Sequence, residues 1–399
     1  MLQISEIFNA AAVLKGVARQ TAMIHAPALS TGADVYLKTE NLQNTGSFKL
    51  RGAYYKISQL TEEEKARGVI ACSAGNHAQG VALAATQAGI KSLICLPAGA
   101  PISKVEATKS YGAEVCLVPG VYDDAYARAL ELQKEHGYVF IHPFDDPKVI
   151  AGQGTVGLEI LEQMPDVNAV VVPIGGGGLI SGVAFAIKTL RPDVKVFGVQ
   201  SSGAPSMASS LKEGKLCHLN DVSTIADGIA VKEPGVNTFE MCNKYVDEVV
   251  TVSDDEIAAA ILTLIEKQKV VAEGAGAVAV AAVMFNKLPV EGLRTVCIVS
   301  GGNIDVNTLN RVITRGLAKS GRNHTFIIDL ADKPGQLSGV CSVIGNHGGN
   351  IISVTHERIN TSTAINGCTI RIEVETRDAK HIKELAEELD KAGFIVCRN

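Results

Sequence analysis

Residues 169–180 read Ala-Val-Val-Val-Pro-Ile-Gly-Gly-Gly-Gly-Leu-Ile. The β-branched run predicts a buried strand, and the glycines predict a tight turn that leads into a helix. Three more short apolar runs, at residues 69–72, 92–96 and 296–299, likewise lead into glycine or proline segments. Buried strands that alternate with helices are typical of parallel sheets. We therefore expect the α/β fold class.

The size and charge of the chain limit its partners. Its 399 residues suffice for two or three domains. The net charge is only −5, with acidic and basic residues interleaved, so we expect no nucleic-acid partner. The longest weakly polar run, residues 274–285, is shorter than the ~20 residues that cross a bilayer. We therefore expect no membrane partner either.

The cysteines indicate a reducing compartment. There are nine, an odd number, and most stand in apolar runs, which is typical of buried free thiols. No Cys-x-x-Cys pair occurs, and no group of His and Cys residues has zinc spacing. The first residues do not have the pattern of a secretory signal. We expect a cytoplasmic protein without a metal site.

One lysine stands in a run of small residues, Thr45-Gly46-Ser47-Phe48-Lys49. An amine in such a run can lose solvent, lower its pKa and act as a nucleophile toward an aldehyde. A lysine after a Gly-Ser turn is more often a solvated residue at a helix start. Three other segments favour the functional interpretation: Ser73-Ala74-Gly75-Asn76-His77, the four glycines at 175–178, and Ser300-Gly301-Gly302-Asn303.

Together these segments resemble the fold type II pyridoxal-phosphate enzymes, and most closely the serine/threonine dehydratases. The resemblance extends over essentially the whole chain. It implies a fold like that of the tryptophan synthase β subunit, with two parallel-sheet subdomains. We expect the large, cofactor-binding subdomain at residues 1–51 and 152–318, and the small, substrate-side subdomain at residues 52–151.

The pattern of the sequence changes near its C-terminal end. Residues 319–324 are polar and small, which predicts a linker. Residues 325–399 predict the order βαββαβ of a ferredoxin-like unit. Residues 332–337 and 348–351 resemble those of an ACT regulatory domain. The resemblance implies binding of an amino-acid effector, such as isoleucine, by Asp332, Pro334, Gly335, Gln336 and Asn350.

ACT units usually pair, so we expect a homodimer or homotetramer with the effector at a subunit interface. The alternative is that the unit only supports oligomerisation, because a fold-level analogy does not establish a site.

Pyridoxal phosphate needs an amine for its aldehyde, a cradle for its phosphate, and partners for its phenolic oxygen and its ring nitrogen. Lys49 is the candidate amine. Glycine amides at a helix start suit a phosphate dianion, although a bare strand-to-helix turn is the alternative reading. The candidate cradle consists of Gly175, Gly176, Gly177, Gly178 and Leu179.

The resemblance assigns the remaining contacts. It implies that Asn76 lies beside the phenolic oxygen, that Ser300 bonds the ring nitrogen and that Phe48 packs by the cofactor. A substrate carboxylate gains from free amides at a helix start, and the residues implied for it are Ser73, Gly75, Asn76 and His77. A helix-start histidine bonded to nearby backbone is an equally good reading of the last of these.

The expected reaction is β-elimination. A neutral hydroxyl at the ring nitrogen, from Ser300, suits elimination better than reactions that need a long-lived carbanion. In serine racemases, which the sequence also resembles, a serine stands where this chain has Ala74. Metal ligands of those racemases stand where this chain has Gln200, Ala204 and Ser206.

We therefore expect an amino-acid substrate, L-threonine and also L-serine, which gives 2-oxobutanoate or pyruvate and ammonia. A serine racemase, a β-replacing synthase and an inactive amino-acid sensor are the alternatives. No Asp or Glu in the motifs stands out as the acid that protonates the leaving hydroxyl. Residues 273–276 are expected to have a structural role and not a catalytic one.

Overall fold

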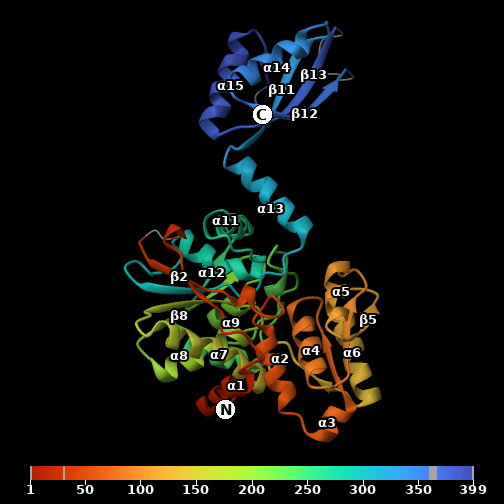
Figure 1. Cartoon of the computed structure of the whole chain (residues 1–399), viewed down its shortest axis with the longest axis vertical. Helices are drawn as coiled ribbons and strands as arrows, with labels where there is room; N and C mark the ends of the chain where they lie inside the picture. Colours follow the sequence, from red (N-terminus) through yellow and green to blue (C-terminus); the bar gives the residue numbers. More distant parts are fainter. Residues whose placement is uncertain (1, 30–31, 359–365, 398–399) are drawn as a thin grey trace. The chain divides into compact units, whose positions relative to one another are not determined.

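The computed structural model describes residues 2–29, 32–358 and 366–397 (Figure 1). These form two compact units, Met1–Thr308 and Leu309–Asn399. The finer boundaries expected for two subdomains and a linker stay predictions. Helix α13 (Val306–Lys319) runs across the division between the two units. None of the described helices is long and apolar enough to cross a membrane.

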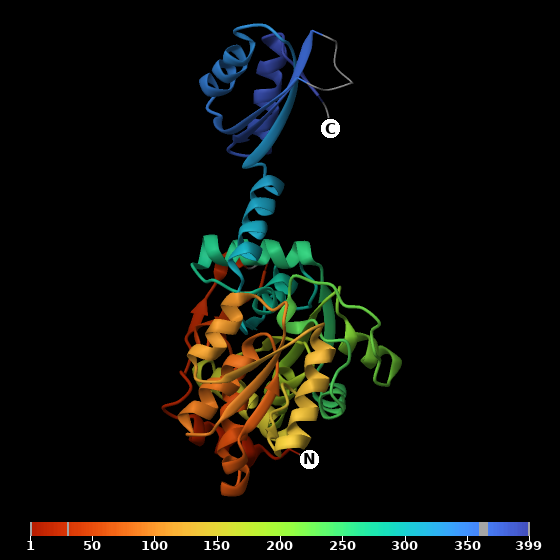
Figure 2. The same cartoon turned by 90° about the vertical axis from the view of Figure 1, so that its right-hand side faces the viewer.

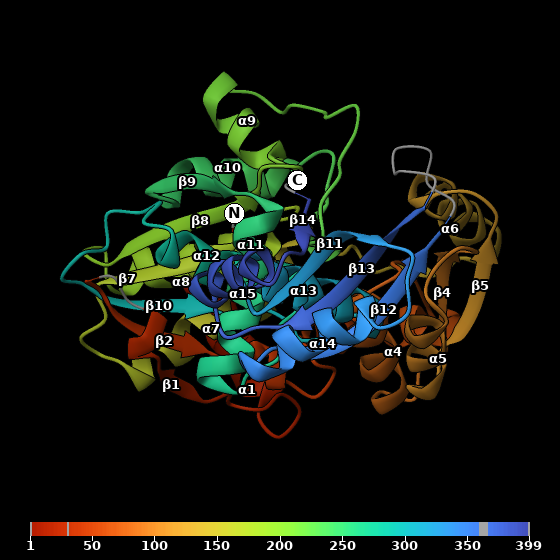
Figure 3. The same ribbon diagram turned by 90° about the horizontal axis from the view of Figure 1, so that it is seen from above.

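The first unit contains a six-stranded sheet, whose strand order can be followed in Figure 3. Strand β1 is antiparallel to β2, and every other neighbouring pair is parallel. In order across the sheet the strands are β1 (Met23–His25), β2 (Asp34–Lys38), β10 (Arg294–Ile298), β7 (Ala169–Pro173), β8 (Lys195–Ser201) and β9 (Glu248–Val252). The predicted buried strand at residue 169 is therefore correct, and it lies inside the sheet.

The first unit also contains a four-stranded sheet that is parallel throughout. Its order is β5 (Glu114–Val118), β4 (Ser92–Pro97), β3 (Val69–Cys72) and β6 (Val139–Phe140). Helices α4 (Asn76–Gln87), α5 (Ile102–Ser110) and α6 (Tyr122–His136) pack against this sheet (Figure 2). Two parallel-sheet subdomains were expected from the sequence, and the structure contains both.

Three helices of the first unit meet with almost no side chain between them. They are α2 (Lys49–Ser58), α7 (Pro147–Gln163) and α8 (Gly178–Leu190). A Cβ on Gly152 of α7 would lie 2.6 Å from the Cα of Gly52 in α2, and a Cβ on Gly182 of α8 would lie 2.3 Å from the carbonyl oxygen of Ile150. These glycines allow α7 to touch the backbones of both α2 and α8.

A buried group of charges holds helix α2. Arg51 lies in α2, is 1% exposed and makes a paired set of hydrogen bonds to each of two carboxylates. Glu40 accepts at 2.8 Å from both Nε and Nη2, and Glu159 accepts at 2.6 and 3.0 Å from Nη1 and Nη2. Lys38 donates to Glu159 at 2.5 Å. Two cations and two carboxylates thus neutralise one another inside the protein.

Beyond α13, the described part of the second unit contains an antiparallel sheet and two helices that pack on it. Its strand order is β12 (Asn350–Glu357), β13 (Gly367–Glu375), β11 (Asn323–Ala331) and β14 (Ile395–Val396), and its helices are α14 (Gln336–Asn346) and α15 (Ala379–Lys391). Both helices contribute to one apolar core with a single face of the sheet. The predicted βαββαβ order is therefore confirmed. Asp378 caps α15 by accepting from the His381 amide at 2.8 Å.

Candidate active site

Lys49 and Ser300 are far apart in the sequence but adjacent in the fold. Lys49 is the first residue of α2, and Ser300 follows β10. The amide of Phe48 donates to the carbonyl oxygen of Ser300 at 3.2 Å, and Ser47 forms an antiparallel bridge with Gly301. The segment that carries the lysine is therefore tied by its backbone to the end of β10.

The amine of Lys49 lies in a protected position. The side chain is half-buried, and Nζ donates to the carbonyl oxygen of Pro143 at 2.8 Å. Nζ also lies 5.3 Å from the ring centroid of Phe48. Burial lowers the pKa of Lys49 to about 8, and the charge of Glu273 opposes that shift. The amine can therefore give up its proton near neutral pH.

Asn76 is held in one orientation by two neighbours. Asn303 donates from Nδ2 to Asn76 Oδ1 and to the carbonyl oxygen of Thr45, both at 2.8 Å. Asn76 Nδ2 donates to Glu273 Oε1 at 2.6 Å. Its amide group has two N–H donors, so one of them remains for another partner. Gly46 has φ +72°, and a Cβ there would lie 2.3 Å from Asn303 Oδ1.

Glu273 is a site residue that the motifs do not single out. It is 4% exposed, and its backbone amide donates to the carbonyl oxygen of Gly301 at 3.1 Å. Burial, and then the charge of Asp227, raises the pKa of Glu273 to about 7. From the sequence, residues 273–276 were expected to have only a structural role. One signal in the sequence could have pointed to Glu273. Its carboxylate directly follows the apolar run at residues 270–272, and a charged residue in such a place is rarely buried without a partner.

The four glycines form a turn with no room for side chains. Gly177 has φ +99°, and α8 begins at Gly178. A Cβ on Gly176 would lie 2.4 Å from the ring of Phe144, and one on Gly177 would lie 2.7 Å from Cβ of Thr238. The first amides of a helix have no partner within it. The turn is therefore suited to an anion that approaches the backbone closely.

The residues implied for a substrate carboxylate surround the start of α4. Gly75 donates its amide to Ser73 Oγ at 3.1 Å. His77 is 2% exposed and its Nε2 lies 2.8 Å from the carbonyl oxygen of Ile141. Burial, and then the charge of Lys49, lowers the pKa of His77 to about 3. The ring is therefore a neutral buried group, and the amides of this helix start are the groups suited to bind an anion.

Two further contacts shape the site. Ser300 is 3% exposed and donates from Oγ to the carbonyl oxygen of Ala275 at 3.3 Å. Gly80 of α4 lies against α2, where a Cβ would be 3.1 Å from the carbonyl carbon of Lys49. Helix α4 thus reaches the backbone of the lysine directly.

The family follows from a comparison with known proteins. Residues 14–301 match the family model described as pyridoxal-phosphate dependent enzyme, and residues 324–393 match the model of the ACT domain. The chain belongs to the pyridoxal-phosphate-dependent enzymes. An L-threonine ammonia-lyase of Thermotoga maritima is 52% identical to this family member over 398 residues, which are 99% of each chain.

Solved structures of the same family are similar. The processed form of threonine deaminase isoform 2 from Solanum lycopersicum is 41% identical, with a TM-score of 0.74 over 78% of this chain and 87% of that one. The structure of maize serine racemase is 36% identical, with a TM-score of 0.75 over 80% of this chain and 98% of that one. This pyridoxal-phosphate-dependent enzyme therefore has the fold type II architecture expected from its sequence.

The described residues fit the cofactor of the family. The glycine turn leaves helix amides open and excludes side chains, as a phosphate requires. Asn76 has an uncommitted N–H, and Lys49 offers an amine of lowered pKa. Leu179 is 4% exposed in the core, so only its backbone can contribute to the cradle. The role of each residue toward the cofactor stays a proposal.

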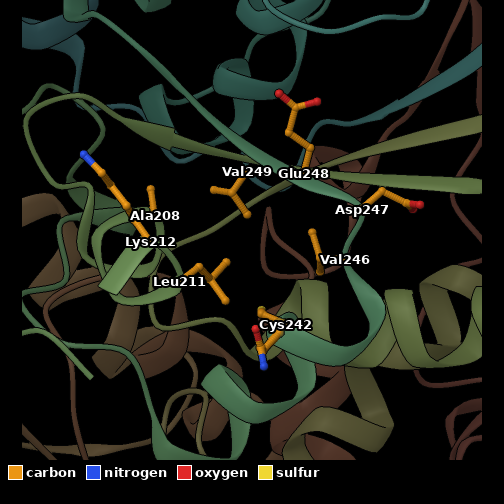
Figure 4. A pocket seen from close by; sticks show the side chains of 9 residues that line it. Ala208, Leu211, Lys212, Cys242, Val246, Asp247, Glu248 and Val249 are labelled. Atoms are coloured by element: carbon orange, nitrogen blue, oxygen red, sulfur yellow. The ribbon is translucent and has the colours of Figure 1, made fainter. Parts of the chain in front are cut away.

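A separate cavity of about 360 Å³ lies between α9 (Ser206–Glu213), α10 (Val236–Tyr245) and β9 (Figure 4). Its lining includes Leu211, Lys212 and Cys242. None of the residues predicted for the active site lines it. This cavity is therefore distinct from the candidate active site of the pyridoxal-phosphate-dependent enzyme.

The residues predicted for the effector do not all meet within one chain. Asp332 precedes α14, and Gly335 is its N-cap with φ +89°. Asn350 begins β12 and is paired with Glu375. Asp332 lies near the opposite end of β13. The preceding residue, Ala331, pairs with Gly367, which is eight positions before Glu375 in that strand. Asp332 and Asn350 therefore do not form one compact site within a single chain.

Proposed function

We propose that this enzyme is a threonine ammonia-lyase, which converts L-threonine to 2-oxobutanoate and ammonia and L-serine to pyruvate and ammonia. The observation that carries the proposal is the likeness to the Thermotoga maritima L-threonine ammonia-lyase over 99% of both chains. That likeness includes the ACT unit as well as the catalytic unit. One methyl group changes binding by only about 1–3 kcal/mol, so both substrates are included.

The site residues would hold pyridoxal phosphate at four points. Lys49 would attach its aldehyde, the amides at the start of α8 would bind its phosphate, and Asn76 and Ser300 would face the phenolic oxygen and the ring nitrogen. When bound, the cofactor supplies an electron sink for the pair left behind as Cα loses its proton.

Lys49 is the proposed base. Its lowered pKa, about 8, leaves part of the amine unprotonated near neutral pH. The carbonyl oxygen of Pro143 holds Nζ at 2.8 Å. Once the substrate has displaced the Lys49 amine from the cofactor, the amine would take the Cα proton of the substrate on the face that Lys49 occupies.

The N-terminus of α4 is the proposed carboxylate site. Ser73 and the helix-start amides would bind the carboxylate of the substrate. Glu273 and Asn303 would keep Asn76 with one N–H directed to its ligand, because each occupies one end of the Asn76 amide. Glu273 also carries a carboxyl group that can hold a proton near pH 7 inside the site.

Serine racemisation is the alternative function, because the structure of maize serine racemase is similar to this one. A racemase needs a second acid or base on the opposite face of Cα. The residue at the corresponding position is Ala74, whose methyl group cannot move a proton. Gln200, at a position implied for a racemase metal ligand, accepts from the amide of Ala208 at 2.8 Å. We therefore favour elimination.

Regulation would come from the ACT unit. An effector changes activity only if it binds one state of the enzyme better than another. We propose that a branched amino acid such as isoleucine does so, at a site between two copies of the unit. A dimeric or tetrameric assembly and a cytoplasmic location remain predictions of the sequence.

The test is a product assay with purified protein and pyridoxal phosphate. L-Threonine should give 2-oxobutanoate and ammonia in equal amounts, L-serine should give pyruvate, and chiral analysis should find little D-amino acid. Production of D-serine as the main product would favour the racemase. Turnover that requires a second substrate would favour the β-replacing synthase.

A further inference from the structure

Three side chains with metal-binding chemistry meet in the ACT unit. They are Asp332, His356 and Cys368, and their ligand atoms all lie within 4.8 Å of one another. They come from three places in the sequence, so the spacing of motifs along the chain does not reveal them. The cluster is separate from the candidate active site, which belongs to the other compact unit.

The register of the sheet explains why they meet. Cys368 is paired with Leu330, and Ile370 is paired with His356. Paired residues share a face of a sheet, as do residues two positions apart in one strand. Cys368, Ile370 and His356 are therefore on one face. Asp332 lies two positions beyond Leu330, and its backbone amide donates to the carbonyl oxygen of Asn366 at 2.8 Å, which keeps it beside β13.

The three groups form a suitable donor set for a borderline metal. Zinc takes thiolate sulfur, imidazole nitrogen and carboxylate oxygen at about 2.0–2.3 Å. Ligands of one tetrahedral ion are then roughly 3.3–3.8 Å apart. Shifts of about 1 Å in side chains that end in rotatable bonds would bring the present atoms to that separation.

The surroundings of the cluster allow a second anchor for the carboxylate. Arg358 Nε lies 3.1 Å from Asp332 Oδ2. A carboxylate has two oxygens, so one can pair with Arg358 while the other faces a metal. Outer partners of this kind orient ligands in known metal sites. Cys368 is 2% exposed and would be the buried anchor, whereas Asp332 and His356 are exposed and leave a path for entry.

We propose that Asp332, His356 and Cys368 bind a divalent transition metal ion of the zinc and cobalt class, with a fourth position open to water. The ion would tie the loop before α14 to strands β12 and β13. This loop is the one predicted to contact an amino-acid effector, so the metal would stiffen a regulatory segment. The site adds a binding function that does not depend on the proposed lyase activity.

Cobalt(II) is the probe for the test. The full-length protein is dialysed against a chelator and then titrated with cobalt chloride, and bound metal is counted by mass spectrometry. We expect one cobalt per chain and visible ligand-field bands typical of four-coordinate cobalt. His356→Ala should weaken binding by at least about tenfold to a hundredfold, since even the loss of an outer partner costs that much.

Matched variants separate this site from adventitious binding. Cys341→Ala and His347→Ala remove a cysteine and a histidine of the same unit that lie outside the cluster, and they should bind cobalt as the wild type does. Cys368→Ala should remove the bands, but it also changes the core, so the exposed His356 is the decisive position. Absence of bound cobalt in the wild type, or unchanged affinity in His356→Ala, would overturn the proposal. Neither outcome bears on turnover of threonine.

Discussion

Replacing Arg51 by alanine should destabilise the catalytic unit strongly. The guanidinium is 1% exposed and faces Glu40, which is completely buried, and Glu159. Without it, two carboxylates would share the single charge of Lys38. Removing one partner of a buried ion pair costs about 3–5 kcal/mol. At 1.4 kcal/mol for each tenfold change, the equilibrium between folded and unfolded states should shift by roughly 100- to 4,000-fold.

The charge of Arg51 also determines the response to acid. Burial alone would raise the pKa of Glu40, but the charge and hydrogen bonds of Arg51 lower it overall. A carboxyl group with a lowered pKa contributes stability above its unfolded pKa and loses it as the pH falls through the folded value. The wild type should therefore lose its advantage over Arg51→Ala in acid.

The assay is urea unfolding, followed by the absorbance of the bound cofactor and by far-ultraviolet circular dichroism. Arg128→Ala is the control, because Arg128 forms an exposed pair with Glu131 and the loss of such a pair should change stability by less than about 1 kcal/mol. The double variant Arg51→Met, Glu40→Gln should recover part of the loss, since Glu159 keeps Lys38. The reasoning is refuted if Arg51→Ala is no less stable than Arg128→Ala.

Four further results are expected. Lys49→Ala should abolish the visible absorbance of the bound cofactor, its fixation by borohydride and turnover of threonine; a variant that still turns over threonine would contradict the assignment. Glu273→Gln removes a carboxyl group whose pKa is raised by burial from 4.5 to about 7. Such a group contributes stability below its unfolded pKa and loses it as the pH rises through about 7, so the variant should gain on the wild type in alkaline urea titrations. Equal pH dependence in both proteins would argue against this. Ala74→Ser should raise formation of D-serine above that of the wild type. If neither protein formed any D-product, the inference that Ala74 prevents racemisation would have no support. Deletion of residues 320–399 should leave a cofactor-loaded enzyme that no longer responds to isoleucine, whereas an unresponsive full-length enzyme would favour a purely structural ACT unit.

The strands could be predicted because their sequences carry a local signal. The β-branched runs at residues 69–72 and 169–174 match β3 and β7 to within one residue. The order of elements in the ACT unit followed in the same way, from alternation such as Ile370, Ile372 and Val374 against polar neighbours. Periodicity and turn residues are properties of a single segment, so a sequence is sufficient to read them.

Sequence motifs can point only to candidate site residues that lie in continuous segments. Glu273 acquires its properties from Asn76 and Gly301, which lie far from it in the sequence. The same holds for the cluster around Cys368, whose members are brought together by strand register. Asn350 and Asp332 belong to one set of motifs but lie at opposite ends of the sheet, and this follows from strand register and not from motif spacing.

Gly80 has a consequence for how this enzyme tolerates substitution. It takes no part in chemistry, yet a methyl group there would press on the peptide of Lys49 at 3.1 Å. The neighbouring backbone of Lys49 and Leu50 would have to move by a few tenths of an ångström. A substitution of Gly80 would therefore disturb the backbone that positions Lys49 while every reactive side chain is retained.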